Sequence, residues 1–359
     1  MSHCQLSFAN SELLNDIRIK LETYMRILIA FLMIALVLSG CKGDLEEQCA
    51  FVPDTKDIVI NLQFESLEDS LPAITSKEQL VKFFSRHPTM RDFMFNRGAY
   101  PDDSVFINQQ YAKFSNPHLD TLLMATKAVF GNGNYLKDEL TKAFANVEYY
   151  YPDFQTPKIQ TVITGLENDL FVSDSLIIIG LDYYLGAKAR YRPNMYEYML
   201  RRYEKNFIVP SIMLLYGIDN RYNKTDLSDR TVLADMVTYG KAYYFAKHMI
   251  PCTPDSVLIG YTGEEIRGAR ANQDMIWKRL VEDEAFFSTN AKVKERFIGE
   301  RPKTYEVGDQ APGRIGTWVG WQIVDSYAEK KSDLTLPQIM RQADAKKIFN
   351  ESGYRPLEK

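Results

Sequence analysis

The most specific chemical signal in the sequence surrounds Cys41. Leu38-Ser39-Gly40 places two small residues directly before this cysteine, which is the arrangement of a lipobox. In a lipobox the cysteine thiol receives a diacylglyceryl group, and cleavage then makes the cysteine the first residue of the mature chain. The twelve residues Ile27–Leu38 are all apolar. This length is typical of a signal peptide and is too short for a helix that crosses about 30 Å of hydrocarbon.

The sequence predicts a signal peptide over residues 1–40 and a lipidated tether over residues 41–56. Met25 and Arg26 supply the basic beginning of such a peptide, so Met25 is the expected start. Acyl chains such as palmitate contribute about 0.8 kcal/mol per buried CH₂, and two or more chains make a stable anchor. Lys42 rather than aspartate follows the cysteine, so nothing favours the inner membrane. We expect attachment to the outer membrane, on either its periplasmic or its surface face.

Two further thiols, Cys49 and Cys252, belong to the mature chain. An envelope compartment permits disulfides, and a bridge between these cysteines would tie the end of the tether to the folded domain. The sequence does not show that they are close, and an isolated cysteine usually behaves as a small buried apolar residue. We therefore favour two unpaired thiols and keep the bridge as the alternative.

Motifs for metal or nucleophilic catalysis are absent from the sequence, which contains no HExxH, GxSxG, GxxxxGK[ST] or GxGxxG. None of His87, His118 and His248 has a second histidine or a carboxylate four residues later. We therefore expect no catalytic residue, no metal and no cofactor. His87 and His118 lie beside prolines as loop or cap residues. His248 is near the end of a predicted helix, where a cationic imidazole interacts favourably with the helix dipole.

Asp182 is the carboxylate best placed for a ligand site. It follows the apolar run Ile177–Leu181, and ligand sites gather at the ends of buried strands. A buried carboxylate without a partner would be costly, so we favour a structural role. In that role Asp182 caps the next turn or pairs with Arg190, Arg192 or Arg314.

The segment Pro312–Tyr327 is the most distinctive stretch of the chain. Its three glycines fall on one helix face, where another backbone can approach closely: Gly313, Gly316 and Gly320. Its two tryptophans do not both fit at the centre of the adjacent apolar stripe. Either one ring faces a groove or a partner, or both belong to the core, which we favour. The candidate ligand or partner surface comprises Asp182, Tyr183, Arg314, Trp318 and Trp321.

The composition excludes several functional classes. The chain has 359 residues, of which 45% are hydrophobic and 25% charged, so a packed core is expected and a disordered tail is not. The net charge of -4 leaves no basic excess for a phosphate backbone, so nucleic acid is not an expected partner. The 22 tyrosines suit binding surfaces, but adjacent tyrosines point in different directions.

The apolar periodicity predicts a helix-rich α+β fold, in which a small β-sheet is packed by many helices. We expect a single domain over residues 57–359, with a hidden division into two lobes as an alternative. The strand patterns cover residues 57–64, 158–164, 170–172 and 175–181. Helix periodicity, with capping signals such as Ser76 and Gln79, covers about 77–86, 117–130, 135–147, 195–205, 208–216, 229–249, 263–285, 312–329 and 335–349.

Several motifs follow the lipobox along nearly the whole mature chain. They are Leu176-Ile-Ile-Ile-Gly-Leu-Asp-Tyr-Tyr-Leu-Gly186, Met236-Val-Thr-Tyr-Gly-Lys-Ala-Tyr-Tyr244, Pro251 through Ser256, Ile259-Gly-Tyr-Thr262, Trp277 and Gly313-Arg-Ile-Gly-Thr-Trp-Val-Gly-Trp-Gln-Ile-Val-Asp-Ser-Tyr327. With the lipobox at Cys41, this combination resembles the gliding-motility lipoprotein GldB family of Bacteroidetes. The resemblance implies a cell-envelope lipoprotein associated with gliding motility and, through shared machinery, with type IX secretion. It transfers no catalytic residues.

The layout of the chain is also similar to that of predicted zinc peptidases, in which a helix with HExxH precedes a helix with a downstream glutamate. The corresponding helices here are Met195–Lys205 and Leu233–Met249, which carry neither the histidines nor that glutamate. This similarity implies a degenerate zincin-like, metallopeptidase-like fold without a metal site.

The leading hypothesis is a lipid-anchored, non-catalytic envelope lipoprotein that acts in a gliding-motility or type IX secretion-associated complex. Its expected partners are the membrane, through lipidated Cys41, and envelope motility or secretion proteins. The alternative is an envelope hydrolase or ligand-binding protein on a degenerate metallopeptidase-like fold, with Asp182, Arg314 and the tryptophans near a cleft. Glycan binding by exposed tyrosines and tryptophans is a third hypothesis.

Overall fold

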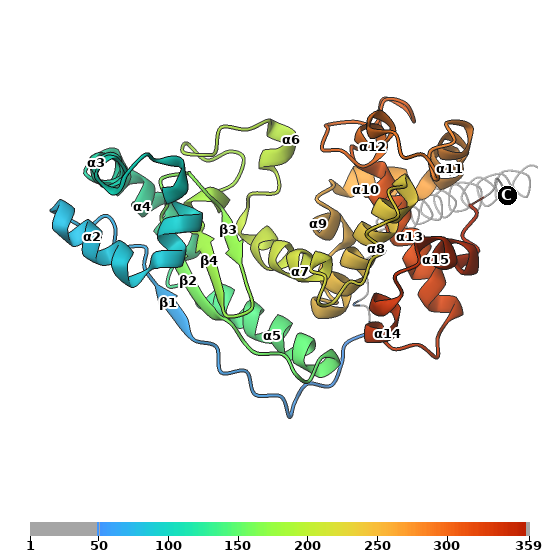
Figure 1. Ribbon diagram of the computed structural model, residues 1–359, viewed down its shortest axis with the longest axis horizontal. Helices are drawn as coiled ribbons and strands as arrows, with labels where there is room; N and C mark the ends of the chain where they lie inside the picture. Colours follow the sequence, from blue (N-terminus) through green and yellow to red (C-terminus); the bar gives the residue numbers. More distant parts are fainter. Residues whose placement is uncertain (1–48, 50, 357–359) are drawn as a thin grey trace, which may run out of the picture. The chain divides into compact units, whose positions relative to one another are not determined.

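The sheet is built around two almost fully buried strands, β2 (Lys158–Val162) and β4 (Leu176–Gly180). The edge strand β1 (Phe64–Ser66) pairs in parallel with β2, and β2 pairs in parallel with β4. On the other edge, β3 (Leu170–Val172) runs antiparallel to β4. The result is one mixed four-stranded sheet in the order β1-β2-β4-β3 (Figure 1).

The computed structural model describes residue 49 and residues 51–356, which belong to one compact unit, Cys49–Lys359. The predicted signal peptide and Cys41 lie outside the described residues. The predicted helix-rich α+β class is confirmed: 53% of the structure is helical. No helix among the described residues is long and apolar enough to cross a membrane.

Apolar clusters cover both faces of the sheet. One cluster includes residues of α2 (Lys77–Arg86), α3 (Asp103–Phe114), α4 (His118–Phe130) and the π-helical turn η1 (Met90–Met94), and the 3-10 turn η2 (Arg97–Ala99) follows η1. Ile178 of β4 belongs to this cluster, whereas Ile177 and Ile179 belong to the cluster on the other face, beside α5 (Asn134–Tyr150). Because successive strand residues point to opposite faces, the continuous apolar run of β4 buries both of its sides, as predicted.

The centre of the helical part is the packing of α8 (Val232–Met249) against α13 (Ile315–Lys330). A Cβ on Gly320 would overlap the carbonyl of Met236, and a Cβ on Gly240 would overlap the main chain of Gly320. The predicted close approach of another backbone to the glycine face is therefore confirmed. Helices α7 (Ile208–Ile218) and α15 (Ala345–Ser352) pack against this pair.

Shorter helical segments complete the described part of the chain. They are η3 (Leu181–Tyr184), α6 (Glu197–Leu200), η4 (Lys205–Phe207), α9 (Asp255–Ile259), α10 (Gly263–Ala271), α11 (Gln273–Glu282), α12 (Ala291–Phe297) and α14 (Leu336–Arg341).

The predicted strand over residues 57–64 is wrong in extent. Strand β1 begins only at Phe64, just after the carbonyl of Gln63 accepts from the N–H of Ile159 (2.8 Å), and the segment before it runs past α5 without a partner strand (Figure 1). Its alternating pattern has another cause, because Leu62 is buried against the domain while Val59 is 87% exposed. The alternation indicates an extended segment that lies on the surface of the domain. An alternating pattern does not distinguish such a segment from a paired strand.

Two predicted helices are each divided in two. The helix predicted over 263–285 is α10 and α11, separated at Asn272, whose side chain donates to the carbonyl of Gly268 (2.8 Å). The helix predicted over 335–349 is α14 and α15, and Asp344 caps α15 by accepting from the N–H of Lys347 (2.9 Å). The apolar period continues across both breaks because both pieces of each pair bury their apolar faces in the same core. The helix predicted over 195–205 shrinks to α6 and a 3-10 turn.

Lys241 is a cation in the interior of the helical part, with an exposed fraction of 1%. Its ammonium group donates to the carbonyls of Lys224 (2.6 Å), Gln342 (2.9 Å) and Met340 (3.3 Å). These contacts join α8 to the loop after α7 and to the end of α14. Burial lowers the pKa of Lys241 to about 7.

Replacing Lys241 with methionine is expected to remove part of the pH dependence of stability. The pKa of Lys241 falls from 10.5 to about 7 on folding, so between these values the unfolded chain binds more protons. This group therefore makes the free energy of unfolding rise with pH in that window. In urea denaturation between pH 7 and pH 9, the free energy of unfolding should rise more steeply with pH for the wild type than for Lys241→Met. Equal slopes for the two proteins would contradict the lowered pKa of Lys241.

Replacing Gly320 with alanine is expected to lower the free energy of unfolding by about 1–3 kcal/mol, since the added methyl group forces α13 away from α8. Gly268 in α10 is the matched control, because nothing lies within 4 Å of a Cβ placed there. Gly268→Ala should stabilise the protein by up to about 1 kcal/mol through helix propensity. Similar effects of the two substitutions in urea denaturation would show that the helix crossing tolerates a larger residue.

Candidate functional site

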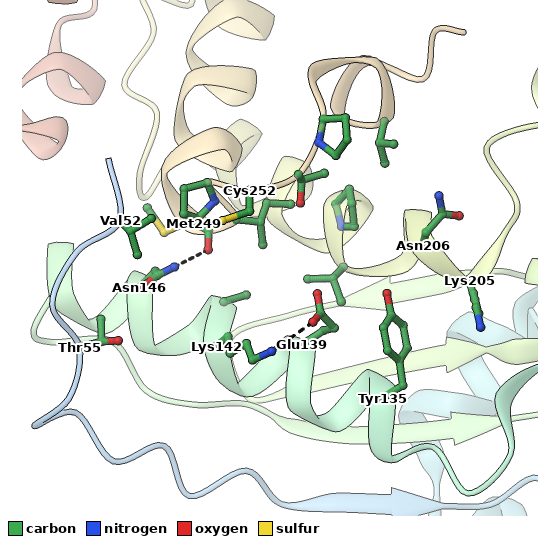
Figure 2. Close-up of a pocket in the computed structure, with 18 residues that line it drawn as sticks. Val52, Thr55, Tyr135, Glu139, Lys142, Asn146, Lys205, Asn206, Met249 and Cys252 are labelled. Atoms are coloured by element: carbon green, nitrogen blue, oxygen red, sulfur yellow. Dashed lines mark hydrogen bonds and ion pairs between the residues drawn. The ribbon is translucent and has the colours of Figure 1, made fainter. Parts of the chain in front are cut away.

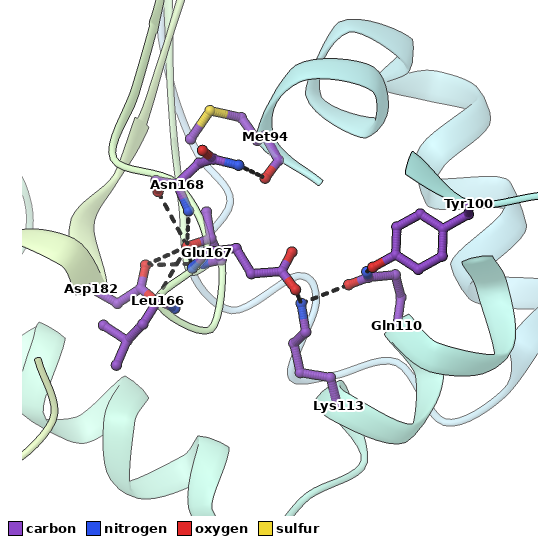
Figure 3. A network of polar contacts seen from close by, with 9 residues as sticks. Met94, Tyr100, Gln110, Lys113, Leu166, Glu167, Asn168 and Asp182 are labelled. Atoms are coloured by element: carbon purple, nitrogen blue, oxygen red, sulfur yellow. Dashed lines mark hydrogen bonds and ion pairs between the residues drawn. The ribbon is translucent and has the colours of Figure 1, made fainter. Parts of the chain in front are cut away.

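Asp182 lies directly after β4, in η3, and is fully buried. Its carboxylate accepts from the main-chain N–H groups of Leu166 (2.6 Å) and Thr164 (2.9 Å), in the loop that joins β2 to β3. Figure 3 shows this loop folded around the carboxylate. Burial raises the pKa of Asp182, and the hydrogen bonds from the loop act in the opposite direction.

The predicted pairing of Asp182 with an arginine is wrong. Arg192 donates to the carbonyl of Ala187, and Arg190 lies over the ring of Tyr191. Main-chain N–H groups take the place of the cation because the loop turns sharply beside the carboxylate, with a left-handed backbone at Gly165 and Leu166. The structural interpretation itself holds, but the loop that Asp182 fixes precedes it in the chain, whereas we expected the next turn.

A second polar network closes the outer side of the same loop (Figure 3). The ammonium group of Lys113 pairs with Glu167 and donates to Gln110 (2.8 Å), and Gln110 donates to the hydroxyl of Tyr100 (3.1 Å). Burial lowers the pKa of Lys113, while the contact with Glu167 raises it. Each charged group has a partner, so this network fixes the loop and offers no side chain for chemistry.

The other members of the predicted ligand surface do not gather around Asp182. Tyr183 is half-buried, with its ring 5.2 Å from that of Tyr203. Arg314 precedes α13 in a left-handed conformation, and its guanidinium donates to the carbonyl of Ile259 (2.7 Å) and lies 3.6 Å from Glu300. These contacts hold Arg314 at the start of α13.

Trp318 and Trp321 are core residues, with exposed fractions of 1% and 3%. Their assignment to a ligand or partner surface is therefore wrong, and the favoured interpretation as core residues is confirmed. Trp321 stacks on Tyr243 of α8, with 5.2 Å between ring centroids. Both rings fit because α13 is buried on several sides, by α8, α12 and α15, rather than along one stripe. The third tryptophan, Trp277, has an exposed fraction of 9% and lines a separate cavity with Phe286 and Phe349.

The histidines have ordinary structural surroundings. His87 caps the end of α2 and lies 3.2 Å from the amide of Gln160, and His118 begins α4. His248 lies in the last turn of α8, as predicted, with its Nδ1 atom 2.8 Å from the carbonyl oxygen of Tyr244, and burial lowers the pKa of its imidazole. Among the described residues no group of three histidine, cysteine, aspartate or glutamate side chains could hold a metal ion.

Cys49 and Cys252 form a disulfide across 203 positions of sequence. The favoured interpretation of two unpaired thiols is therefore wrong, because folding brings the start of the described chain to the turn after α8. The bridge secures the first described residue. In the segment that follows it, Phe51 and Val52 are mostly exposed, whereas Pro53 is buried.

A groove of about 560 Å³ lies beside this disulfide (Figure 2). Its apolar wall comes from α5, α7 and the segment that connects α8 to α9, and Val52 and Thr55 close one end. The apolar lining residues are Val52, Ala143, Val209, Pro210, Met249, Ile250, Pro251, Pro254 and Val257. The volume lies within the range of about 300–1,000 Å³ that is usual for ligand pockets.

Polar side chains surround the groove. Figure 2 shows Tyr135, Glu139 and Asn146 extending from α5 toward the opposite wall. Asn146 donates to the carbonyl of Met249 (2.8 Å), and Lys142 lies 3.5 Å from Glu139. Sequence reasoning missed this site because its residues come from four separate segments and match no motif. The only signal was the pair of cysteines.

Replacing Asp182 with asparagine should loosen the β2–β3 loop. In asparagine, an NH₂ donor replaces one of the two carboxylate oxygens that accept from the main-chain N–H groups of the loop. At least one of these hydrogen bonds is then lost, so the free energy of unfolding should fall by about 1–3 kcal/mol. Hydrogen exchange at Leu166 should accelerate. Asp309 is exposed, and Asp309→Asn provides the matched control with little expected effect. Unchanged exchange at Leu166 in Asp182→Asn would contradict the proposed clamp.

Comparisons with known proteins complete the description of the site. Searches of curated proteins and of solved structures each returned no match. A family model described as gliding motility protein GldB matches residues 48–356, and so confirms the resemblance seen in the sequence motifs. The chain therefore belongs to the GldB family of gliding-motility lipoproteins.

Proposed function

We propose that this protein is a lipid-anchored, non-catalytic member of an envelope complex that serves gliding motility or type IX secretion. One observation carries the proposal: a lipobox that ends at Cys41 stands seven residues before the region that matches the GldB family. A signal of this kind places a soluble domain at a membrane surface without a transmembrane helix. We further propose that the anchored face is that of the outer membrane.

The contacts of three charged side chains inside the domain support a non-catalytic role. Asp182 fixes a loop, Arg314 holds the start of α13, and Lys241 joins main-chain carbonyls. A catalytic group must be able to reach a substrate. The polar atoms of these three side chains instead form hydrogen bonds within the protein.

Ligand binding is the second candidate function, and the groove beside the disulfide favours it. It differs from the site expected for a hydrolase on a degenerate metallopeptidase-like fold, which would need Asp182, Arg314 and the tryptophans at one cleft. Partner proteins of the motility or secretion machinery fit the anchored scaffold better than a soluble substrate does, because the lipid confines the domain to one surface.

Replacing Cys41 with alanine in the source bacterium tests the anchor. The wild type should incorporate labelled palmitate and run as a processed chain, whereas Cys41→Ala should incorporate none and accumulate as the longer precursor. In Cys41→Ala, motility or secretion proteins should no longer co-purify with the protein. Gliding or secretion should be lost in the same variant. Cys4→Ala is the matched control, since Cys4 precedes the expected start at Met25. A Cys41→Ala protein that still carries label, or still supports function, would overturn the proposal.

A further inference from the structure

The groove beside the disulfide has the composition of a site for an aliphatic chain with a polar end. Its wall contains Pro210, Pro251 and Pro254, none of which has a backbone N–H. The side-chain amide of Asn146 is already engaged with the carbonyl of Met249. The prolines therefore offer no main-chain N–H to the carbonyl groups of an extended peptide, and this part of the wall cannot pair with one as a strand does. A hydrocarbon chain needs no such pairing, and burying it is favourable in proportion to its area.

The charges at the rim favour an anionic end group. Lys205 lies beside the groove with its ammonium 5.6 Å from the centre of the Tyr135 ring, and no described carboxylate is within ion-pair distance of it. The one rim carboxylate, Glu139, has Lys142 as its neighbour at 3.5 Å. The rim therefore carries one excess positive charge. A phosphate group next to an acyl chain matches this arrangement.

The anchor keeps the groove near such molecules. Cys252 lines the groove and is bonded to Cys49, and Cys49 is eight residues from Cys41. Eight fully extended residues span at most about 29 Å. If Cys41 carries lipid, as the proposed function holds, the wall of the groove can never be much farther than this from the bilayer.

We propose that the groove binds one acyl chain of a membrane phospholipid, with the phosphate at Lys205. The proposal rests on the anchoring part of the proposed function only for the supply of lipid. The binding itself follows from the groove and can be measured separately.

The test uses the wild-type lipidated protein in detergent, mixed with dioleoyl phosphatidylethanolamine and followed by native mass spectrometry. We expect one phospholipid per chain. Val257→Trp fills the groove and should weaken binding at least about tenfold, while Val281→Trp, which lines a different cavity, should not. Both variants are to be checked for native circular dichroism. Absence of the adduct in the wild type, or equal loss in both variants, overturns the proposal.

A charge variant tests the position of the phosphate. Lys205→Glu should weaken binding of the phospholipid about tenfold and leave binding of dioleoyl glycerol, which lacks the phosphate, unchanged. Lys137→Glu on the exposed side of α5 is the matched control. Equal losses for both lipids, or for both variants, would overturn the assignment to Lys205. A phospholipid adduct in the wild type together with failed palmitate labelling would refute the proposed lipid anchor at Cys41. It would leave the proposed lipid binding in the groove standing.

Discussion

The approach of α8 to α13 at Gly240 and Gly320 is the constraint on which the helical part depends. Two main chains can meet this closely only where no Cβ atom stands between them, as at these two glycines. The crossing sets the distance between the two helices and so the space available to the rings around them. Trp321 stacks on Tyr243 within that space, and Arg314 at the start of α13 reaches the carbonyl of Ile259. The position of each group follows from the same contact.

The sheet and the helical part meet along α5, and this boundary explains where the groove lies. One side of α5 packs its apolar residues into the core that contains Ile177 and Ile179 of β4. Several of its polar side chains, among them Glu139 and Asn146, line the groove together with residues of α7 and of the turn after α8. Pro251 and Pro254 restrict the backbone of this turn and themselves supply no N–H donor. The groove is thus the space left between two well-packed parts.

Elements with strong local signals could be predicted from the sequence. Ser76 accepts from the N–H of Gln79 at the start of α2, and the apolar run of β4 is buried on both faces as expected. The glycines of α13 correctly indicated a close neighbour. Several predictions failed because they concern residues whose contacts are distant in the sequence. The Cys49–Cys252 bridge joins residues 203 positions apart, and Asp182 accepts from main-chain N–H groups 16 and 18 positions earlier in the chain. The groove could not be predicted for the same reason. The breaks between α10 and α11 and between α14 and α15 were missed for another reason, because the apolar period continues across both of them.

The disulfide also determines how the domain carries mechanical load. A pull applied at residue 49 passes through the sulfur atoms to Cys252, at the end of the central helix α8. Without the bond, the same pull would act on the extended segment after residue 49 and then on β1, an edge strand of three residues. Strand β1 pairs with β2 alone, whereas α8 packs against α7, α13 and α15. The covalent link therefore carries tension applied at residue 49 directly to the end of α8, along a path that does not pass through the sheet.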